Sequence, residues 1–237
     1  MKQKLTPILS ELKNHAPFTL FGASTGIICM LLFKNMDTEI NHKLFQIFHP
    51  THVVLSAIVT AALYKLYKKK ASFLTVLLIG YTGAIGVATV SDCILPFFGE
   101  SLLGVAIPTH QHENETEDVN DHEQHEHTEH ADEHDGPKIH LGFIEDWYIV
   151  NPAAILGVFI AFFLPKTKFP HAGHVLISTW ASSFHVLMNT HREMSPQILI
   201  GMFVVLFIAV WLPCCISDIV FPLLFVKSGE YVPHVHH

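Results

Sequence analysis

Long apolar stretches divide the chain into two groups of three, separated by a strongly polar segment. Six stretches approach the roughly 20 apolar residues that a helix needs to cross a bilayer; they are 17–33, 50–67, 73–97, 149–165, 172–189 and 197–225. The second and the fifth stretch are the most polar. The pattern predicts an all-α fold, a polytopic helical membrane protein with about six transmembrane helices.

The composition supports a membrane protein. Hydrophobic residues make up 50% of the 237 residues and charged residues 15%, whereas a soluble domain carries about 25% charged residues. No basic patch with interleaved aromatic residues occurs, so we expect the lipid bilayer as a partner and no nucleic acid. The cysteines lie in apolar surroundings without a C-x-x-C pair, so we expect them to act as small apolar residues; they are Cys29, Cys93, Cys214 and Cys215.

Basic residues near the ends of the apolar stretches predict the orientation. Lysines precede the first stretch and follow the second and the fourth, namely Lys2, Lys4, Lys13, Lys65, Lys68, Lys69, Lys70, Lys166 and Lys168. Cytoplasmic segments are enriched in Lys and Arg. We therefore expect an integral protein of a plasma or inner membrane, with both termini in the cytoplasm and the loop 101–148 on the outside. The basic residues that oppose this orientation are outnumbered; they are Lys34, Lys43 and Arg192.

Polar motifs recur in the same order in both halves of the chain. They are H-x-x-H-V-x-x-S at 49–56 and 171–178, S-D-x-x-x-P at 91–96 and 217–222, and a weaker P-x-x-x-x-G at 17–22 and 152–157. This order predicts a duplicated three-helix unit, with one copy in 1–100, the loop in 101–148 and the second copy in 149–237. Because three spans are an odd number, the second copy enters the membrane from the opposite side, as in the inverted repeats of many secondary transporters.

The repeated residues have the chemistry of a metal site. Histidines three residues apart lie on one face of a helix, and two imidazoles with a carboxylate from a neighbouring helix form a set that suits zinc. The predicted ligands are His49, His52 and Asp92 in the first half and His171, His174 and Asp218 in the second, with Ser56, Ser91, Ser178 and Ser217 as secondary oxygen donors. Inversion places the first set towards the outer helix ends and the second towards the inner ends, which allows two separate sites or one shared site.

A proline follows each of the two aspartates and adds a second argument. Pro96 and Pro222 have no N–H, so the carbonyl oxygens of Asp92 and Asp218 lose their helical partners. Transporters commonly build cation sites at broken helix ends that are rich in oxygen donors. The prolines therefore predict a helix break at each aspartate.

Further candidate histidines outside the repeat occur in two places, one in the fifth apolar stretch and eight in the loop. His185 lies on nearly the same helix face as His174, and it either carries metal or protons or is a structural histidine bonded to Ser182 or a neighbouring helix. The loop contributes His110, His112, His122, His125, His127, His130, His134 and His140 among many Glu and Asp. A segment of this composition cannot bury a core and should be disordered. It is typical of weak, multi-site and pH-dependent metal binding.

These features together predict a membrane transporter for a divalent transition-metal cation, with zinc as the first choice and the outer loop gathering ions. The combination is similar in organisation to the ZIP and cation-diffusion-facilitator zinc transporters, which also pair intramembrane His and Asp with a His-rich loop. The H-x-x-x-D and H-E-x-x-H motifs of such helices are absent, and the span count and the repeat differ, so no family is assigned. A homodimer is compatible with this interpretation.

Two other functions fit part of the pattern. An intramembrane zinc-dependent hydrolase acting on lipid would use His49, His52 and Asp92 to hold a zinc ion that activates water, with Ser56 and Ser91 nearby. A hydrolase needs one site, however, and both copies keep the same residues. A haem-binding or metal-sensing membrane protein would instead use paired histidines across helices. We therefore expect a transporter before an enzyme.

Removal of the loop should weaken the activity without abolishing it, because the predicted ligands within the membrane lie outside the loop. A chain lacking 110–140 should still bind about one or two zinc ions after purification. Metal analysis after equilibrium dialysis measures this number. Zinc-free protein after the deletion would contradict an intramembrane site.

Overall fold

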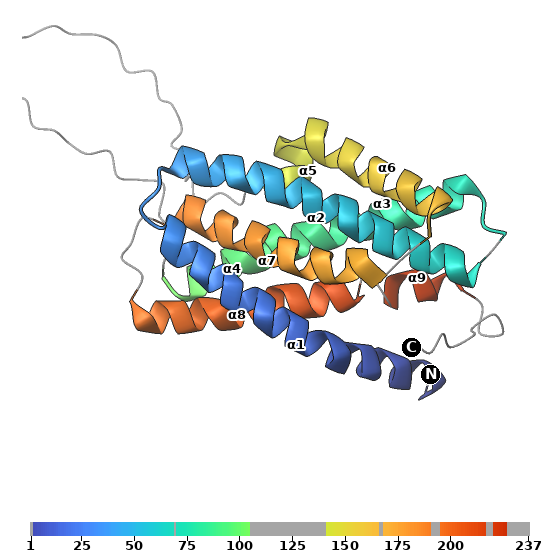
Figure 1. The fold of residues 1–237 in the computed structure, drawn as a ribbon, viewed down its shortest axis with the longest axis horizontal. Helices are drawn as coiled ribbons and strands as arrows, with labels where there is room; N and C mark the ends of the chain where they lie inside the picture. Colours follow the sequence, from blue (N-terminus) through green and yellow to red (C-terminus); the bar gives the residue numbers. More distant parts are fainter. Residues whose placement is uncertain are drawn as a thin grey trace, which may run out of the picture.

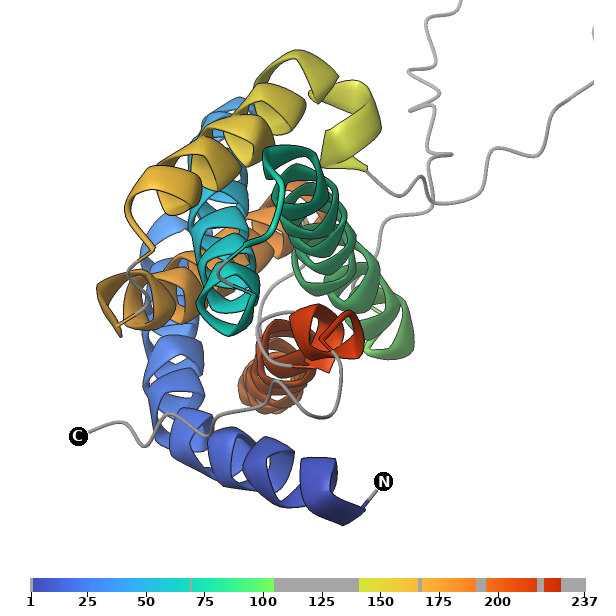
Figure 2. The same ribbon diagram turned by 90° about the vertical axis from the view of Figure 1, so that its right-hand side faces the viewer.

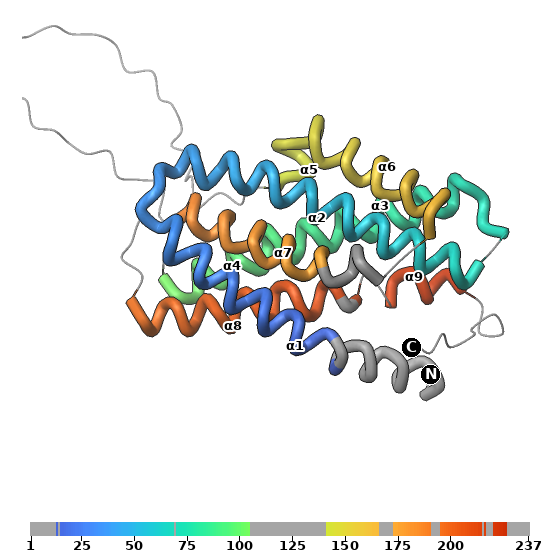
Figure 3. The backbone as a smooth tube through the Cα atoms, viewed as in Figure 1, coloured from blue at the N-terminus to red at the C-terminus, as the bar shows by residue number. Residues whose placement is uncertain are grey.

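The computed structural model describes residues 2–68, 70–104, 141–165, 168–190, 195–216 and 220–226, most of which can be located by their colours in Figure 3. Within these ranges, the side chains of 2–12, 14, 168–172 and 215 are also left undescribed. The predicted His-rich loop, with all of its candidate histidines, lies outside the described residues.

The described residues form helices and no strand, so the prediction of an all-helical chain is confirmed for them. In order they are α1 (Lys2–Phe33), α2 (Thr38–Tyr67), α3 (Phe73–Thr89), the π-helical turn η1 (Val90–Ile94), α4 (Leu95–Leu102), α5 (Gly142–Glu145), α6 (Trp147–Phe163), α7 (Lys168–Asn189), α8 (Pro196–Cys215) and α9 (Phe221–Leu224). Serine caps start two of them, because the hydroxyl oxygens of Ser72 and Ser195 accept the backbone N–H groups of Thr75 and Ile198.

Helices α2 and α7 form the centre of the bundle. They pack against each other, while α6, α3 and α9 cover α2, and α1, α8 and α4 cover α7. Figure 1 shows α2 and α7 side by side along the long axis, and the view along that axis in Figure 2 shows the other helices arranged around them. The helices with the H-x-x-H motifs are therefore the ones that neighbours shield most.

Polar side chains face the interior of this bundle and large apolar side chains face outwards. Helices α2 and α7 bury Asn41, His49, His52, Ser56, Thr60, His174, Ser178, Thr179, Ser182, Ser183 and His185. The outer helices expose many large apolar side chains, among them Phe21, Leu32, Leu74, Leu78, Leu156, Phe163 and Ile200. Polar residues are costly against lipid and are normally placed inside a bundle. The low hydropathy of the second and fifth predicted spans follows from this central position.

Four helices are long and apolar enough to cross a membrane: His15–Phe33 in α1, the whole of α2, the continuous run Phe73–Leu102, and Pro196–Cys214 in α8. Helix α6 is apolar but shorter, with 17 residues. The described part of the chain therefore has the character of a membrane protein.

The position of the H-x-x-H motif in α2 corrects one prediction. We expected a span that opens at residue 50, with His49 and His52 near a helix end. The helix instead begins at Thr38 and continues through Pro50 to Tyr67, so both histidines lie near its middle. Polar residues before the apolar stretch, such as Glu39, Asn41 and His42, did not stop the helix, because a helix can extend beyond its apolar section.

The run Phe73–Leu102 corrects the predicted break at Pro96. The chain stays helical there by way of η1, in which the N–H of Leu95 donates to the carbonyl of Val90, five residues earlier. In this register the missing N–H of Pro96 frees the carbonyl of Ser91. The hydroxyl of Ser182 donates to that oxygen at 3.0 Å. The helix therefore accommodates the proline with a wider turn and a hydroxyl from α7.

Glycines allow the closest approaches to the central helices. A Cβ added at Gly157 in α6 would lie 2.4 Å from the carbonyl oxygen of Val54 and 2.7 Å from Cβ of Ala57, both in α2. Real Cβ atoms do not approach a backbone oxygen so closely, and two helices would have to separate to admit it. Gly157 thus sets the distance between α6 and α2.

Gly157→Ala should destabilise the protein by about 1–3 kcal/mol, the usual cost of overpacking a tight contact. Gly86→Ala is the matched control, because a Cβ at this exposed position in α3 has no atom within 4 Å. The control should be neutral or stabilise by up to about 1 kcal/mol through helix propensity. Thermal unfolding in detergent distinguishes them, and equal effects of the two substitutions would contradict the packing.

Candidate metal centre

The carboxylate of Asp92 organises the polar interior. Its Oδ2 atom accepts Nδ1 of His49 at 2.9 Å and Nδ1 of His52 at 2.6 Å. Its Oδ1 atom accepts the hydroxyls of Ser91 at 2.7 Å and Ser178 at 2.9 Å. Each of these side chains is buried. A buried carboxylate is tolerated when hydrogen bonds replace the lost water, and four donors meet that need here.

These hydrogen bonds define which nitrogen of each histidine remains available. A carboxylate accepts from Nδ1–H, and a neutral imidazole then carries its lone pair on Nε2. The Nε2 atoms of His49 and His52 are buried and make no hydrogen bond with the described residues. In metal sites the ligating histidine usually donates its other N–H to a carboxylate, which fixes the ring orientation and raises its basicity. Asp92 is placed for this positioning role, in contrast to the predicted role as a direct ligand.

The local sequence explains how three elements meet at Asp92. The i,i+3 spacing puts His49 and His52 on the same face of α2. The wider turn η1 begins two residues before Asp92, and π-helical turns are frequent at functional sites. The third element is α7, which contributes Ser178 one turn after His174.

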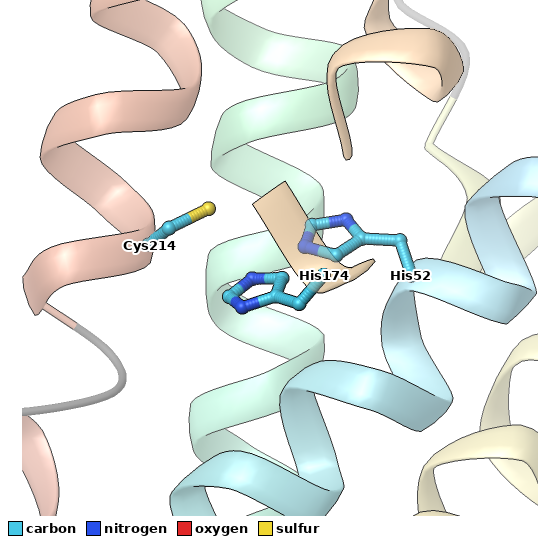
Figure 4. Close-up of side chains that lie close together, drawn as sticks. All are labelled: His52, His174 and Cys214. Atoms are coloured by element: carbon cyan, nitrogen blue, oxygen red, sulfur yellow. The ribbon is translucent and has the colours of Figure 1, made fainter. Parts of the chain in front are cut away.

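His52, His174 and Cys214 form a group of possible metal ligands. The rings of His52 and His174 stack with centroids 4.8 Å apart and an angle of 17° between their planes. One ligand atom from each of the three residues lies within 4.8 Å of the other two, and all three side chains are buried. Figure 4 shows them approaching one another from α2, α7 and α8. The thiol of Cys214 also lies 4.0 Å from the hydroxyl of Ser178, which connects this group to Asp92.

The donor set fits a soft or borderline divalent cation. Zinc binds imidazole nitrogen at about 2.0–2.1 Å and thiolate sulfur at about 2.3 Å, which places tetrahedral ligand atoms roughly 3.4–3.7 Å apart. A contraction of about 1 Å from the 4.8 Å limit therefore brings all three atoms to zinc distance. Three protein ligands leave a fourth position open for water or a further ligand. A thiolate at Cys214 and the carboxylate of Asp92 would balance the two positive charges of the cation.

The structure brings together many of the predicted site residues and leaves others apart. His49, His52, Asp92, His174, Ser91 and Ser178 meet in one buried centre that both halves of the chain supply. Ser56 is buried nearby in α2, but its hydroxyl makes no hydrogen bond with the described residues. His185 lies apart from this centre, and its Nδ1 atom contacts the carboxylate of Glu100 in α4 at 3.2 Å. The side chain of His171 and the residues Ser217 and Asp218 lie outside the described part of the chain.

Sequence reasoning missed Cys214 as a ligand and Glu100 altogether. Cys214 precedes Asp218 by four residues, so a helical spacing could have placed it on the face of the predicted carboxylate. Glu100 stands four residues beyond Pro96, where we expected the helix to have ended. No protein-family model, curated protein or solved structure that we compared matches the chain.

Cys214→Ala should remove the near-ultraviolet thiolate absorption that cobalt(II), used as a zinc substitute, acquires at this centre. Cys93→Ala is the matched control, because Cys93 is equally buried but its thiol lies outside the ligand group. Asp92→Asn should keep the band but weaken cobalt binding by about 10–100-fold, the usual cost of losing the group that orients a ligand. An unchanged spectrum in Cys214→Ala, or loss of the band in Cys93→Ala alone, would contradict the assignment.

Proposed function

We propose that the chain is a membrane transporter for a divalent transition-metal cation, with zinc as the preferred substrate. The observation that carries the proposal is the meeting of the two H-x-x-H helices, where His52 and His174 stack at 4.8 Å beside Cys214 in the interior of the bundle. In this proposal the chain has six spans in two inverted halves, with both termini in the cytoplasm. The loop 101–148 then lies outside and gathers ions.

The packing of the helices supports the inverted repeat. Suppose that α1, α2 and α3 correspond to α6, α7 and α8. Each contact between the halves then has an equivalent contact in which the two halves have exchanged roles. Helix α1 packs on α7 as α6 packs on α2, and α1 packs on α8 as α6 packs on α3. The glycines of the weak P-x-x-x-x-G motif take part, because Gly22 lies against Thr179 of α7 and Gly157 lies against Val54 of α2. Related contacts on both H-x-x-H helices are what a duplicated unit would produce.

The second copy of the S-D-x-x-x-P motif gives further support. In the first copy, the π-helical turn covers Val90–Ile94 and α4 starts at Leu95. The corresponding positions in the second copy, Ile216 and Val220, are also π-helical, and α9 starts at Phe221. π-Helical residues at matching positions of both halves are what a duplicated unit would produce.

The division of the ligands between halves favours transport over a static metal site. His52 comes from the first half, and His174 and Cys214 come from the second. A movement of one half against the other would therefore separate the ligands and release the ion, as in alternating access. Prolines in the ligand-bearing helices, Pro50 in α2 and Pro213 in α8, weaken the local hydrogen bonding and give these helices places to bend.

The chemistry of the donors favours zinc over magnesium or calcium. Imidazole and thiolate suit zinc and other late transition metals, whereas the alkaline-earth cations prefer oxygen ligands. Haem is disfavoured at the paired histidines, because axial imidazoles bind the iron end-on from opposite faces of the macrocycle. The rings of His52 and His174 instead stack on each other, with centroids 4.8 Å apart and an angle of 17° between their planes. The burial of the centre favours an ion over a lipid as the substrate.

Purified protein in proteoliposomes should carry zinc across the membrane down an imposed gradient, measured with a zinc-sensitive dye inside the vesicles. His52→Ala and His174→Ala should each abolish the flux, because each removes a ligand from a three-ligand set. Gly86→Ala, at an exposed position without neighbours, should transport like the unmodified protein. Lipid turnover without zinc flux would overturn the proposal in favour of a hydrolase. Undiminished flux in both histidine variants would overturn the assigned site.

A further inference from the structure

A second polar cluster lies in the interior, away from the centre at Asp92. The carboxylate of Glu100 in α4 contacts Nδ1 of His185 at 3.2 Å and Nδ2 of Asn189 at 3.1 Å, both from α7. The amide nitrogen of Asn189 lies 3.4 Å from Nδ1 of His185. Glu100 and His185 are fully buried.

The burial of Glu100 is expensive for a structural contact. No lysine or arginine among the described residues pairs with it, and the basic group that it contacts there is the imidazole of His185. Well-packed apolar residues often serve stability as well as a buried ion pair does. An ionisable group inside a membrane bundle therefore points by default to a function, commonly a site on an ion pathway.

The geometry points to a second cation site at Glu100, His185 and Asn189, and we propose that the transported divalent cation occupies it in transit. The Glu100–His185, Glu100–Asn189 and Asn189–His185 contacts measure 3.2, 3.1 and 3.4 Å. These distances are close to the roughly 3.4 Å between nitrogen or oxygen ligands around zinc. Nε2 of His185 makes no hydrogen bond with the described residues. The ring can therefore carry its proton on Nε2 and offer the Nδ1 lone pair to the cation. The amide of Asn189 supplies its oxygen by rotating about its last side-chain bond.

Along the chain, Glu100 of this cluster lies between Asp92 and the start of the loop. Glu100 follows Asp92 by eight residues in the same continuous helical run, a rise of about 12 Å, and the described segment ends four residues later at Gly104. The ring of Phe45 connects the two centres, because it stacks on His49 at 4.9 Å and meets the edge of His185 at 5.7 Å. This inference rests on the proposed function and gives the transported ion an entry site on the loop side.

Zinc binding to the full-length protein tests the second site. Equilibrium dialysis should show that Glu100→Gln binds about one zinc ion fewer per chain than the unmodified protein, while the loop contributes equally to both. The cobalt–thiolate band at Cys214 should persist in this variant, which shows that it is folded and that the first centre is intact. If folded Glu100→Gln binds as many zinc ions per chain as the unmodified protein, the proposed second site is wrong.

Asn189→Asp separates a cation site from a structural hydrogen-bond network. The new carboxylate beside Glu100 should lower the melting temperature without zinc, because two like charges are then buried together. If the cluster is a cation site, Asn189→Asp should also raise the affinity for zinc about 10-fold or more, since an added charged ligand strengthens binding. Zinc should therefore raise the melting temperature of this variant more than that of the unmodified protein. If zinc does not restore the melting temperature of Asn189→Asp, the proposal is overturned.

The two proposals fail in different ways. If Cys214→Ala abolishes zinc flux while Glu100→Gln keeps the full zinc number and flux, the second site is wrong and the transporter proposal stands. If neither substitution changes zinc binding or flux, the first centre is wrong as well, and the inference built on it is overturned with it.

Discussion

The structure depends on one buried carboxylate. Asp92 is fully buried, and it is stable there because four side-chain donors reach its two oxygens. Loss of one partner from such a buried network commonly costs about 3–5 kcal/mol. The donors come from α2, α7 and the residue before Asp92. These helices therefore have to be neighbours, and they have to carry polar residues where lipid cannot reach them.

The same constraint explains the division of labour among the ligands. Because Oδ2 of Asp92 is bonded to Nδ1 of His49 and of His52, the Nε2 atoms of both rings remain available to a metal in the interior. One of these rings stacks on His174, which brings the second half of the chain and Cys214 into the same centre. A carboxylate that orients histidines towards a metal is a common arrangement in metalloproteins. Here the histidines come from both H-x-x-H motifs of the chain, so the movement that we propose for transport would separate the ligands.

Much of this centre could be predicted from the sequence, and the rest required the packing of the helices. The H-x-x-H spacing and the polar residues in apolar stretches indicated which residues would gather, because helical periodicity is a local property. The predicted start of α2, residue 50, lies 12 residues after the observed start at Thr38, since hydropathy marks the apolar section of a helix and not its ends. Cys214 and Glu100 were missed because their roles depend on which neighbouring helix they face. A cysteine among apolar residues has the same local pattern whether it packs or binds a metal.

The position of a bound zinc ion tests the central claim most directly. Anomalous scattering at the zinc absorption edge, measured on crystals of the full-length protein grown with zinc, locates the ion independently of the loop. We expect a peak in the bundle interior with bonds to His52, His174 and the sulfur of Cys214, and with Asp92 behind His52. Zinc found only on the loop histidines, with His52 and His174 still stacked as they are in its absence, would contradict it.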